Sequence, residues 1–269
     1  MIDVCFFADE VSKDFDEAVK LGVQAGANTV EVRGGLWGKS VTTIDNDDVK
    51  RMQDVLAKYN AKVASIGSPF GKCHHEKPEE YAQHLRYFDR MVELAHAFET
   101  RVIRGFAFWK TDGKGDANRP NIAAYLDMIV EKLSPVIPIA EREGVTLALE
   151  NEGSTLVGTC REARAVIDAL GNSSALTVCW DVLNGLHCGE TPYPDGYAHI
   201  KGLVTHIHVK PNRDKTLNPV GATNVTYEEV FRIVLADGFR GAASIEHWGS
   251  PELMLKGVRE LRAAIDGMS

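Results

Sequence analysis

The feature that most constrains the fold of this chain is a regular alternation between short apolar runs and longer amphipathic segments. Short runs rich in valine, isoleucine and phenylalanine are typical of buried β-strands. The runs are VCFF (from Val4), NTVEV (from Asn28), KVASI (from Lys62), RVIRGFAF (from Arg101), VTLALE (from Val145), ALTVCWD (from Ala175), VTHIHV (from Val204) and AASIEHW (from Ala242). Strands separated by helices are expected to run parallel, because each helix carries the chain back to the start of the next strand.

The segments between the runs have helical periodicity. Apolar stripes with steps of three and four residues predict helices that face a core. They comprise Tyr81, Leu85, Phe88, Val92 and Ala95, and Met254, Val258, Leu261 and Ile265. Helix starts are predicted where Thr159 is followed by Glu162, the spacing of a capping box, and where Ser250 precedes Pro251.

Eight strand–helix units in 269 residues average about 34 residues each, within the size of a βαβ unit. This arithmetic predicts an α/β fold with the (β/α)8 architecture of a TIM barrel. We expect one domain over residues 1–269, since no linker-like segment divides the chain. Alternation alone fits a doubly wound open sheet as well, so closure has to be argued from the polar residues.

Charge and composition limit the partners of this chain. Thirty basic and 38 acidic residues give a net charge of −8, and a surface of that sign repels nucleic acid. No run reaches the ~18 apolar residues of a membrane span, and the N-terminal residues lack the basic segment of a signal peptide. Five scattered cysteines suit a reducing compartment. We therefore expect a cytoplasmic protein with a small-molecule partner. The sequence leaves open whether the chain forms a homo-oligomer.

Chemically capable side chains follow the predicted strands at their carboxyl ends, where a barrel has its active site. They are Asp9, Glu10, Glu31, Arg33, Arg104, Trp109, Glu150, Asn151, Glu152, Asp181, Asn184, His206, His208, Lys210, Glu246 and His247. An open sheet would spread these side chains along a line, whereas a barrel gathers them around one axis. The pattern therefore favours the closed barrel.

Glu150, Asp181, His208 and Glu246 form the candidate metal site, because four consecutive strands supply one ligand each. Carboxylates and imidazole suit Mn²⁺, Mg²⁺, Co²⁺ or Zn²⁺. Without a cation, carboxylates gathered in one barrel mouth would repel each other. Each residue alone also fits a structural role, and a carboxylate in the position of Asp181 is equally often the N-cap of the next helix.

His206 and His208 lie two residues apart and are expected on the same face of their strand. His208 is nearer the carboxyl end, where the site opens, so we assign it as the ligand. His206 lies one layer deeper, where it either supports His208 or is a hydrogen-bonded core residue.

Other side chains near the strand ends are candidates for substrate binding. Lys210 is able to stabilise an oxyanion or bind a carboxylate, and it equally fits a solvated loop. Arg104 and Arg33 suit an acidic substrate or a neighbouring carboxylate. Trp109 and Trp248 are expected to form apolar walls against a sugar ring or to cap the barrel.

Eight sequence blocks resemble the xylose isomerase-like TIM barrels, in order and over essentially the whole chain. They are ADEV (Ala8 to Val11), VEVRGG (Val30 to Gly35), GSPFGK (Gly67 to Lys72), LALENEG (Leu147 to Gly153), CWDVLNG (Cys179 to Gly185), PYPDGY (Pro192 to Tyr197), HIHVKP (His206 to Pro211) and SIEHW (Ser244 to Trp248). That superfamily includes sugar isomerases and epimerases, hydroxypyruvate isomerase, inosose dehydratase and an apurinic endonuclease.

The resemblance implies one divalent metal on Glu150, Asp181, His208 and Glu246. In the ketose epimerases of this superfamily the metal binds two adjacent oxygens of the sugar, and two glutamates exchange a carbon-bound proton through an enediolate. Those glutamates match Glu150 and Glu246 here. Exchange on two faces of the carbon gives epimerisation, and transfer between neighbouring carbons on one face gives isomerisation.

Two positions depart from the tagatose and psicose epimerases. Their substrate-contacting histidine, three residues after the aspartate ligand, is replaced by Asn184, and an arginine six residues after the histidine ligand is replaced by Asp214. Both changes alter how sugar hydroxyls are read, so that specific activity is not carried over, and Asn184 remains a substrate-binding candidate. The endonuclease branch needs extra metal ligands and a DNA-binding surface, against which the net charge of −8 argues.

We therefore predict a divalent-metal-dependent isomerase or epimerase of carbohydrate metabolism. Its expected substrate is a small sugar, a keto acid or another polyhydroxy carbonyl compound. Two alternatives stay open: a dehydratase of the inosose type on the same metal site, and a barrel that binds sugar or metal without catalysis.

Overall fold

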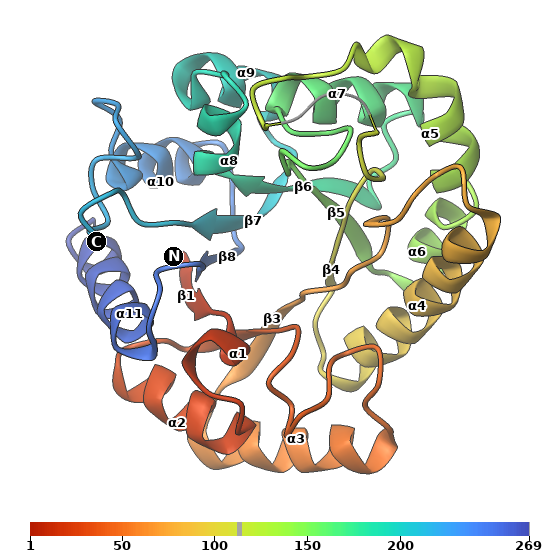
Figure 1. Ribbon diagram of the computed structural model, residues 1–269. Coiled ribbons are helices and arrows are strands. Elements are labelled where there is room, and N and C mark those ends of the chain that lie inside the picture. The colour runs from red at the N-terminus through yellow and green to blue at the C-terminus, as the bar shows by residue number, and fades with distance from the viewer. Residues whose placement is uncertain (112–114, 269) are drawn as a thin grey trace.

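The computed structural model, which describes residues 1–111 and 115–268, is a barrel of parallel strands surrounded by helices (Figure 1). The strands are β1 (Asp3–Phe6), β2 (Thr29–Val32), β3 (Lys62–Ile66), β4 (Val102–Gly105), β5 (Thr146–Glu150), β6 (Leu176–Asp181), β7 (Val204–Val209) and β8 (Ala242–Ile245). Each strand overlaps one of the eight predicted runs. The predicted TIM barrel fold, built as a single unit, is confirmed.

The barrel closes between β1 and β2. Parallel ladders join the strands in the order β1-β8-β7-β6-β5-β4-β3-β2, so β1 and β2 are the two ends of the sheet. These ends meet at one parallel bridge between Phe7 and Glu31. Beside it, Asn28 Oδ1 accepts the Val4 amide at 2.8 Å and the Thr29 hydroxyl donates to the Val4 carbonyl at 3.2 Å. The sheet is therefore a nearly closed barrel and not the open-sheet alternative.

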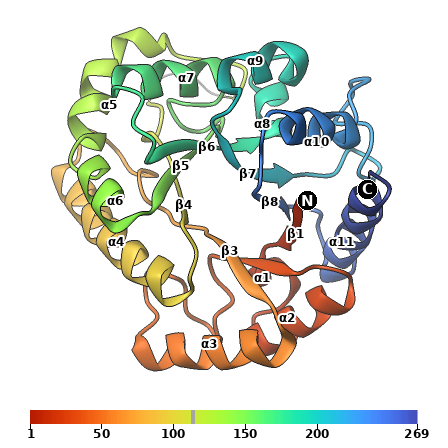
Figure 2. The ribbon, with the colours of Figure 1, turned by 180° about the vertical axis from the view of Figure 1, so that it is seen from behind.

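The helices form a ring outside the strands, which Figure 2 shows from the opposite side. In the described residues they are α1 (Ala8–Val11), α2 (Phe15–Gln24), α3 (Asn46–Tyr59), α4 (Pro78–Ala97), α5 (Leu126–Leu133), α6 (Ile137–Glu143), α7 (Cys160–Ala169), α8 (Val182–His187), α9 (Tyr197–Ile200), α10 (Tyr227–Ala236) and α11 (Pro251–Asp266), with the short turns η1 (Ile122–Ala124) and η2 (Pro192–Gly196). The predicted capping box of Thr159 and Glu162 is present at α7, and Ser250 caps α11. None of the described helices combines the length and the apolar character that a membrane span needs.

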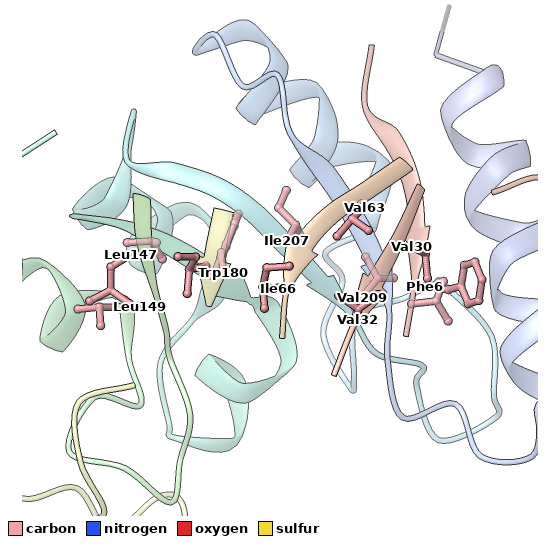
Figure 3. Packing of buried hydrophobic residues seen from close by; sticks show 14 of the residues in the cluster. Phe6, Val30, Val32, Val63, Ile66, Leu147, Leu149, Trp180, Ile207 and Val209 are labelled. Atoms are coloured by element: carbon pink, nitrogen blue, oxygen red, sulfur yellow. The ribbon is translucent and has the colours of Figure 1, made fainter. Parts of the chain in front are cut away.

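The main hydrophobic core lies between the strands and the outer helices (Figure 3). Because side chains alternate along a strand, every second residue points toward the helices. Leu147 and Leu149 of β5 belong to this core, whereas Ala148 between them does not. The alternate positions, Glu150 included, face the interior of the barrel.

The interior of the barrel is where ionisable side chains are buried. Glu31 of β2, Arg104 of β4, and His206 and His208 of β7 each have at most 5% of their surface exposed. Their strand neighbours Val30, Val32, Ile103, Ile207 and Val209 belong to the core on the helix side, so the period of two separates the two environments. The five cysteines are buried, unpaired thiols, as expected for small core residues.

Candidate metal centre

The four predicted metal ligands meet at the carboxyl-terminal end of the barrel. Glu150 ends β5, Asp181 ends β6, His208 is the penultimate residue of β7, and Glu246 directly follows β8. All four are buried, and one ligand atom from each lies within 4.8 Å of the others. We call these residues the four-residue cluster. The strand ends bring together side chains that are as much as 96 positions apart, because residues 150 and 246 both close one barrel mouth.

The cluster has buried polar atoms without hydrogen-bond partners, which a bound cation would satisfy. Glu150 Oε2, Asp181 Oδ2, His208 Nδ1 and Glu246 Oε2 are buried atoms with no hydrogen-bond partner among the described residues. Leaving a buried polar group unsatisfied costs about 1–3 kcal/mol, and more for a charged group. Oxygen and imidazole nitrogen donors are those that Mg²⁺, Mn²⁺, Co²⁺ and Zn²⁺ accept. The residues present therefore fit a divalent metal ion.

Asp181 caps a helix with one carboxylate oxygen and directs the other toward the cluster. Its Oδ1 accepts the Asn184 amide at 2.8 Å and caps α8. Its Oδ2 faces the cluster, where Lys210 Nζ lies 2.7 Å away as an ion pair that lacks hydrogen-bond geometry. Burial raises the pKa of Asp181 above its ordinary value despite the opposing effect of Lys210. A cation beside Oδ2 would favour the ionised form.

Glu31 is a buried residue of this region to which the sequence interpretation assigned no role. Its Oε2 lies 2.8 Å from His206 Nε2 and 3.2 Å from His208 Nε2. A carboxylate at Nε2 orients the His208 ring, so that Nδ1 faces Glu150 and Glu246 at 3.4 and 3.6 Å. His206 contacts the His208 ring edge to face and shares this carboxylate with it. Both histidines are thus held by one oxygen atom.

The charge states around His208 follow from burial and from neighbouring charges. Burial alone would raise the pKa of Glu31, but the two histidines outweigh it and hold that pKa well below its usual range. Burial lowers the pKa of His208, yet the surrounding acidic groups outweigh it and raise the pKa well above its usual value. Burial also raises the pKa of Cys179 to about 12. Cys179, 3.5 Å from His208 Nε2, is therefore a neutral thiol and a poor metal ligand.

The buried Arg104 and the partly buried Lys210 flank the carboxylates of the cluster. Lys210 Nζ lies 2.8 Å from Asn184 Oδ1 and 3.4 Å from Glu246 Oε2. Arg104 Nη1 lies 3.3 Å from Glu150 Oε2. Burial raises the pKa values of Glu150 and Glu246, but the nearby positive groups, above all His208, outweigh it and both pKa values fall below the ordinary range. Both glutamates are therefore ionised and able to accept a proton.

A cavity of about 400 Å³ adjoins the cluster, a size that suits a small molecule. Two cluster residues, Glu150 and Glu246, line it together with Arg104. The other lining residues are Arg33, Ser40, Val41, Thr42, Gly67, Pro69, Lys72, Phe106, Glu152 and His247. The Phe106 side of the cavity is held by a backbone hydrogen bond, in which the Phe106 amide donates to the Phe70 carbonyl at 2.9 Å. Gly71 allows this approach, because a Cβ there would lie 1.9 Å from the Phe106 carbonyl oxygen.

The residues predicted to bind substrate lie in different environments. Arg104 lines the cavity. Asn184 is buried and Lys210 partly buried beside Asp181, and neither is among the described residues that line the cavity. Trp109 lines a neighbouring cavity, and the Lys72 ammonium lies 5.2 Å from its ring centre.

Trp248 does not lie at the site, which corrects its prediction as a wall for the substrate. It is fully buried, its indole nitrogen donates to Val209 O at 3.0 Å, and a Cβ added to Gly257 of α11 would lie 2.7 Å from its ring. The physical reason is that β8 ends at Ile245. The left-handed backbone of His247 (φ 58°) then redirects the chain toward the helices.

Solved structures share this fold over nearly the whole chain. A xylose isomerase-like TIM barrel protein from Mycobacterium smegmatis, in complex with magnesium, has a TM-score of 0.75 and 16% identity, covering 99% of this chain and 97% of that chain. D-psicose 3-epimerase from Clostridium cellulolyticum, with D-tagatose, has a TM-score of 0.74 and 13% identity, covering 99% and 98%. A probable 3-DHS dehydratase from Bacillus anthracis has a TM-score of 0.73 and 15% identity, covering 97% and 98%. At these identities the likeness is one of fold.

The sequence itself matches a family model over residues 19–264, from within α2 to within α11. The description of that family is xylose isomerase-like TIM barrel. The match includes seven of the eight strands and all four residues of the cluster. The chain therefore belongs to the xylose isomerase-like TIM barrel family.

Proposed function

We propose that this chain is a divalent-metal-dependent enzyme that isomerises or epimerises a small sugar or a related polyhydroxy carbonyl compound. The observation that carries the proposal is the convergence of four buried residues with metal-ligating side chains, each of which also has a buried polar atom without a hydrogen-bond partner among the described residues, beside a cavity of small-molecule size. Sugar epimerases among the solved structures with this fold support the same class of reaction.

Glu150, Asp181, His208 and Glu246 would hold the metal. A divalent cation in such a site supplies Lewis acidity, which increases the acidity of the carbon next to a substrate carbonyl. The donor set accepts Mg²⁺, Mn²⁺, Co²⁺ or Zn²⁺. The magnesium complex of a protein with the same fold makes Mg²⁺ the first cation to try, with Mn²⁺ next.

Glu150 and Glu246 would move the carbon-bound proton. Both are ionised, both line the cavity, and β6 and β7 separate the strands that carry them. They therefore reach a bound molecule from different sides. If one carboxylate removes the proton and the other returns it, the carbon is epimerised; if one carboxylate transfers the proton to the neighbouring carbon, the product is the isomer.

The same groups also support the loss of water as a second candidate reaction. Removal of the carbon-bound proton is common to both reactions, and they differ in whether the proton returns or a neighbouring hydroxyl leaves. The Lys210 ammonium, 3.4 Å from Glu246 Oε2, is a cation placed beside one of these carboxylates. A probable dehydratase is among the solved structures with this fold.

One experiment separates these functions. The protein is loaded with Mg²⁺ or Mn²⁺ and incubated in D₂O with ketoses, keto acids and inososes, and carbon-bound deuterium is followed by NMR. Deuterium uptake without loss of water is the result expected for an isomerase or epimerase. An enone-type product that absorbs in the ultraviolet would replace the proposal by a dehydratase. Tight metal binding with neither product would indicate a barrel that binds without catalysis.

A further inference from the structure

Arg104 is a buried arginine whose donors are poorly satisfied by the protein. It has 5% of its surface exposed, and its Nε has no hydrogen-bond partner in residues 1–111 and 115–268. Its Nη1 approaches Glu150 Oε2 at 3.3 Å and Glu246 Oε1 at 3.9 Å. Both distances exceed the 2.7–2.9 Å of a charge-assisted hydrogen bond.

Two other partly buried arginines have hydrogen-bond partners within the chain. Arg33 donates to Asp9 Oδ2 and Glu10 Oε1, each at 2.9 Å. Arg119 donates to both carboxylate oxygens of Glu162 and to two backbone carbonyls. A buried guanidinium is costly unless its donors are paired. Arg104 therefore retains donors for a partner that the folded chain does not supply.

The carboxylates nearest to Arg104 are also proposed metal ligands. The carboxylate oxygen paired most closely with Arg104 is Oε2 of Glu150, a residue of the four-residue cluster. A divalent cation and the guanidinium therefore compete for the same negative charge. Once these carboxylates bind a cation, the negative charge that neutralises Arg104 has to come from another group.

The surroundings of Arg104 favour a partner that enters through the cavity. The Arg104 guanidinium lies 5.5 Å from the ring centre of Phe7 and 5.0 Å from that of Phe106. Arg104 lines the same 400 Å³ cavity as Glu150 and Glu246. A single small molecule in this cavity is thus able to reach the guanidinium and the proton-transferring carboxylates together.

We infer that Arg104 binds a carboxylate of the substrate, so that the site selects a sugar acid over the corresponding neutral sugar. This inference rests on the proposed function and deepens it. One guanidinium matches one carboxylate in charge and in its two-pronged geometry. A phosphate ester offers the same kind of oxyanion with a second charge, and it forms a separate arm of the test.

The test compares ketoses that differ at one terminal carbon: D-fructose, D-fructuronate and D-fructose 6-phosphate. Each is titrated into the Mg²⁺-loaded protein by calorimetry, with wild type, Arg104→Met, Arg104→Lys and Lys72→Met. Methionine removes the charge and keeps an unbranched side chain in the buried position. Lys72→Met is the matched control, because it removes another cation of the same cavity, one that is more exposed than Arg104 and donates a hydrogen bond to Glu152.

We expect D-fructuronate to bind wild type at least about tenfold more tightly than D-fructose, because a hydrogen bond between charged groups contributes about that factor to affinity. Arg104→Met abolishes this ratio, Arg104→Lys keeps part of it, and Lys72→Met retains it. Equal binding of the two compounds to wild type, including no binding of either, would overturn the inference. A ratio that survives in Arg104→Met would do so too, and a preference for the 6-phosphate alone would replace the carboxylate by a phosphate ester.

Metal binding provides a second readout that needs no substrate. Because Arg104 competes with the cation for Glu150, Arg104→Met should bind Mn²⁺ at least as tightly as wild type, and a weaker affinity would contradict this account. The deuterium experiment keeps the two proposals distinguishable. Selective binding of D-fructuronate without carbon-bound exchange in any substrate would reject the proposed function, whereas exchange with equal binding of acid and neutral sugar would reject only the role of Arg104.

Discussion

At the scale of single residues, side chains that share one cavity have different tasks. Glu150 and Glu246 are proposed to move a proton. Glu152 lines the same cavity but its carboxylate bonds to Ser154 and pairs with Lys72. The chain therefore contains a matched acidic control for the two proposed catalytic glutamates.

We predict that Glu150→Gln and Glu246→Gln each lower turnover by about 10²–10⁴-fold, because an amide cannot accept the proton. The shape of the side chain is kept, so circular dichroism should show a folded barrel. Glu152→Gln is expected to stay within a few-fold of wild type. Full activity in metal-loaded Glu246→Gln would show that the two-glutamate scheme is wrong.

A second prediction at this scale concerns Glu31. Glu31→Gln keeps the size of the side chain but replaces the charged oxygen that both histidines contact with a neutral amide, so the interaction that orients His208 is weakened. Loss of such a supporting carboxylate typically costs about 10–100-fold in metal affinity. Calorimetric titration with Mn²⁺ measures it, and an unchanged dissociation constant would remove Glu31 from the description of the metal centre.

At the scale of the elements, the alternation along each strand explains which site residues could be predicted. Glu150, Asp181 and His208 stand at or near the ends of long apolar runs, so counting strand ends identified them. Glu31 carried a usable signal, an acidic residue between Val30 and Val32 on a predicted strand. Its partner histidines are 175 and 177 positions away, and only the barrel shows that they share its oxygen.

Trp248 shows where reasoning from strand ends fails. The run AASIEHW reads as one strand, but β8 stops at Ile245 and the positive φ of His247 breaks the alternation. A backbone turn of this kind depends on local contacts, here the His247 amide donating to Glu10 at 2.6 Å. Glu10 lies at the other end of the sequence, so the turn is not visible in the run itself.

The packing of Trp248 gives a prediction for α11. A Cβ at Gly257 would lie 2.7 Å from the buried indole. Gly257→Ala should therefore lower the free energy of unfolding by about 1–3 kcal/mol, the usual cost of overpacking, against the roughly 1 kcal/mol that alanine gains in a helix. Urea unfolding measures the change. A stabilised variant would contradict the packing, and Mn²⁺ affinity should not change, because Trp248 lies away from the cluster.

At the scale of the whole molecule, the count of eight strand–helix units predicted the barrel, and the contact between β1 and β2 confirms its closure. The net charge of −8 argued against nucleic acid as a partner. Three of the acidic side chains that make the net charge negative, Glu150, Asp181 and Glu246, lie in the cluster at the barrel mouth. Substrate identity was not readable from the sequence, because it depends on side chains that line the cavity from loops after several strands.

The cluster also predicts how metal affects the stability of the whole barrel. Four strand ends share the cation, so it binds the folded chain and not the unfolded one. At a free concentration of one hundred times the dissociation constant, Mn²⁺ should add about 2.7 kcal/mol to the free energy of unfolding. Thermal unfolding with and without a chelator measures this. A melting temperature that is insensitive to both metal and chelator would count against a resident metal.

The most direct test of the metal centre is the anomalous scattering of crystals grown with Mn²⁺. We predict one strong anomalous peak per chain, within bonding distance of Glu150, Asp181, His208 and Glu246. A peak elsewhere, such as between Glu10 and His247, or the absence of any peak at millimolar Mn²⁺, would contradict it.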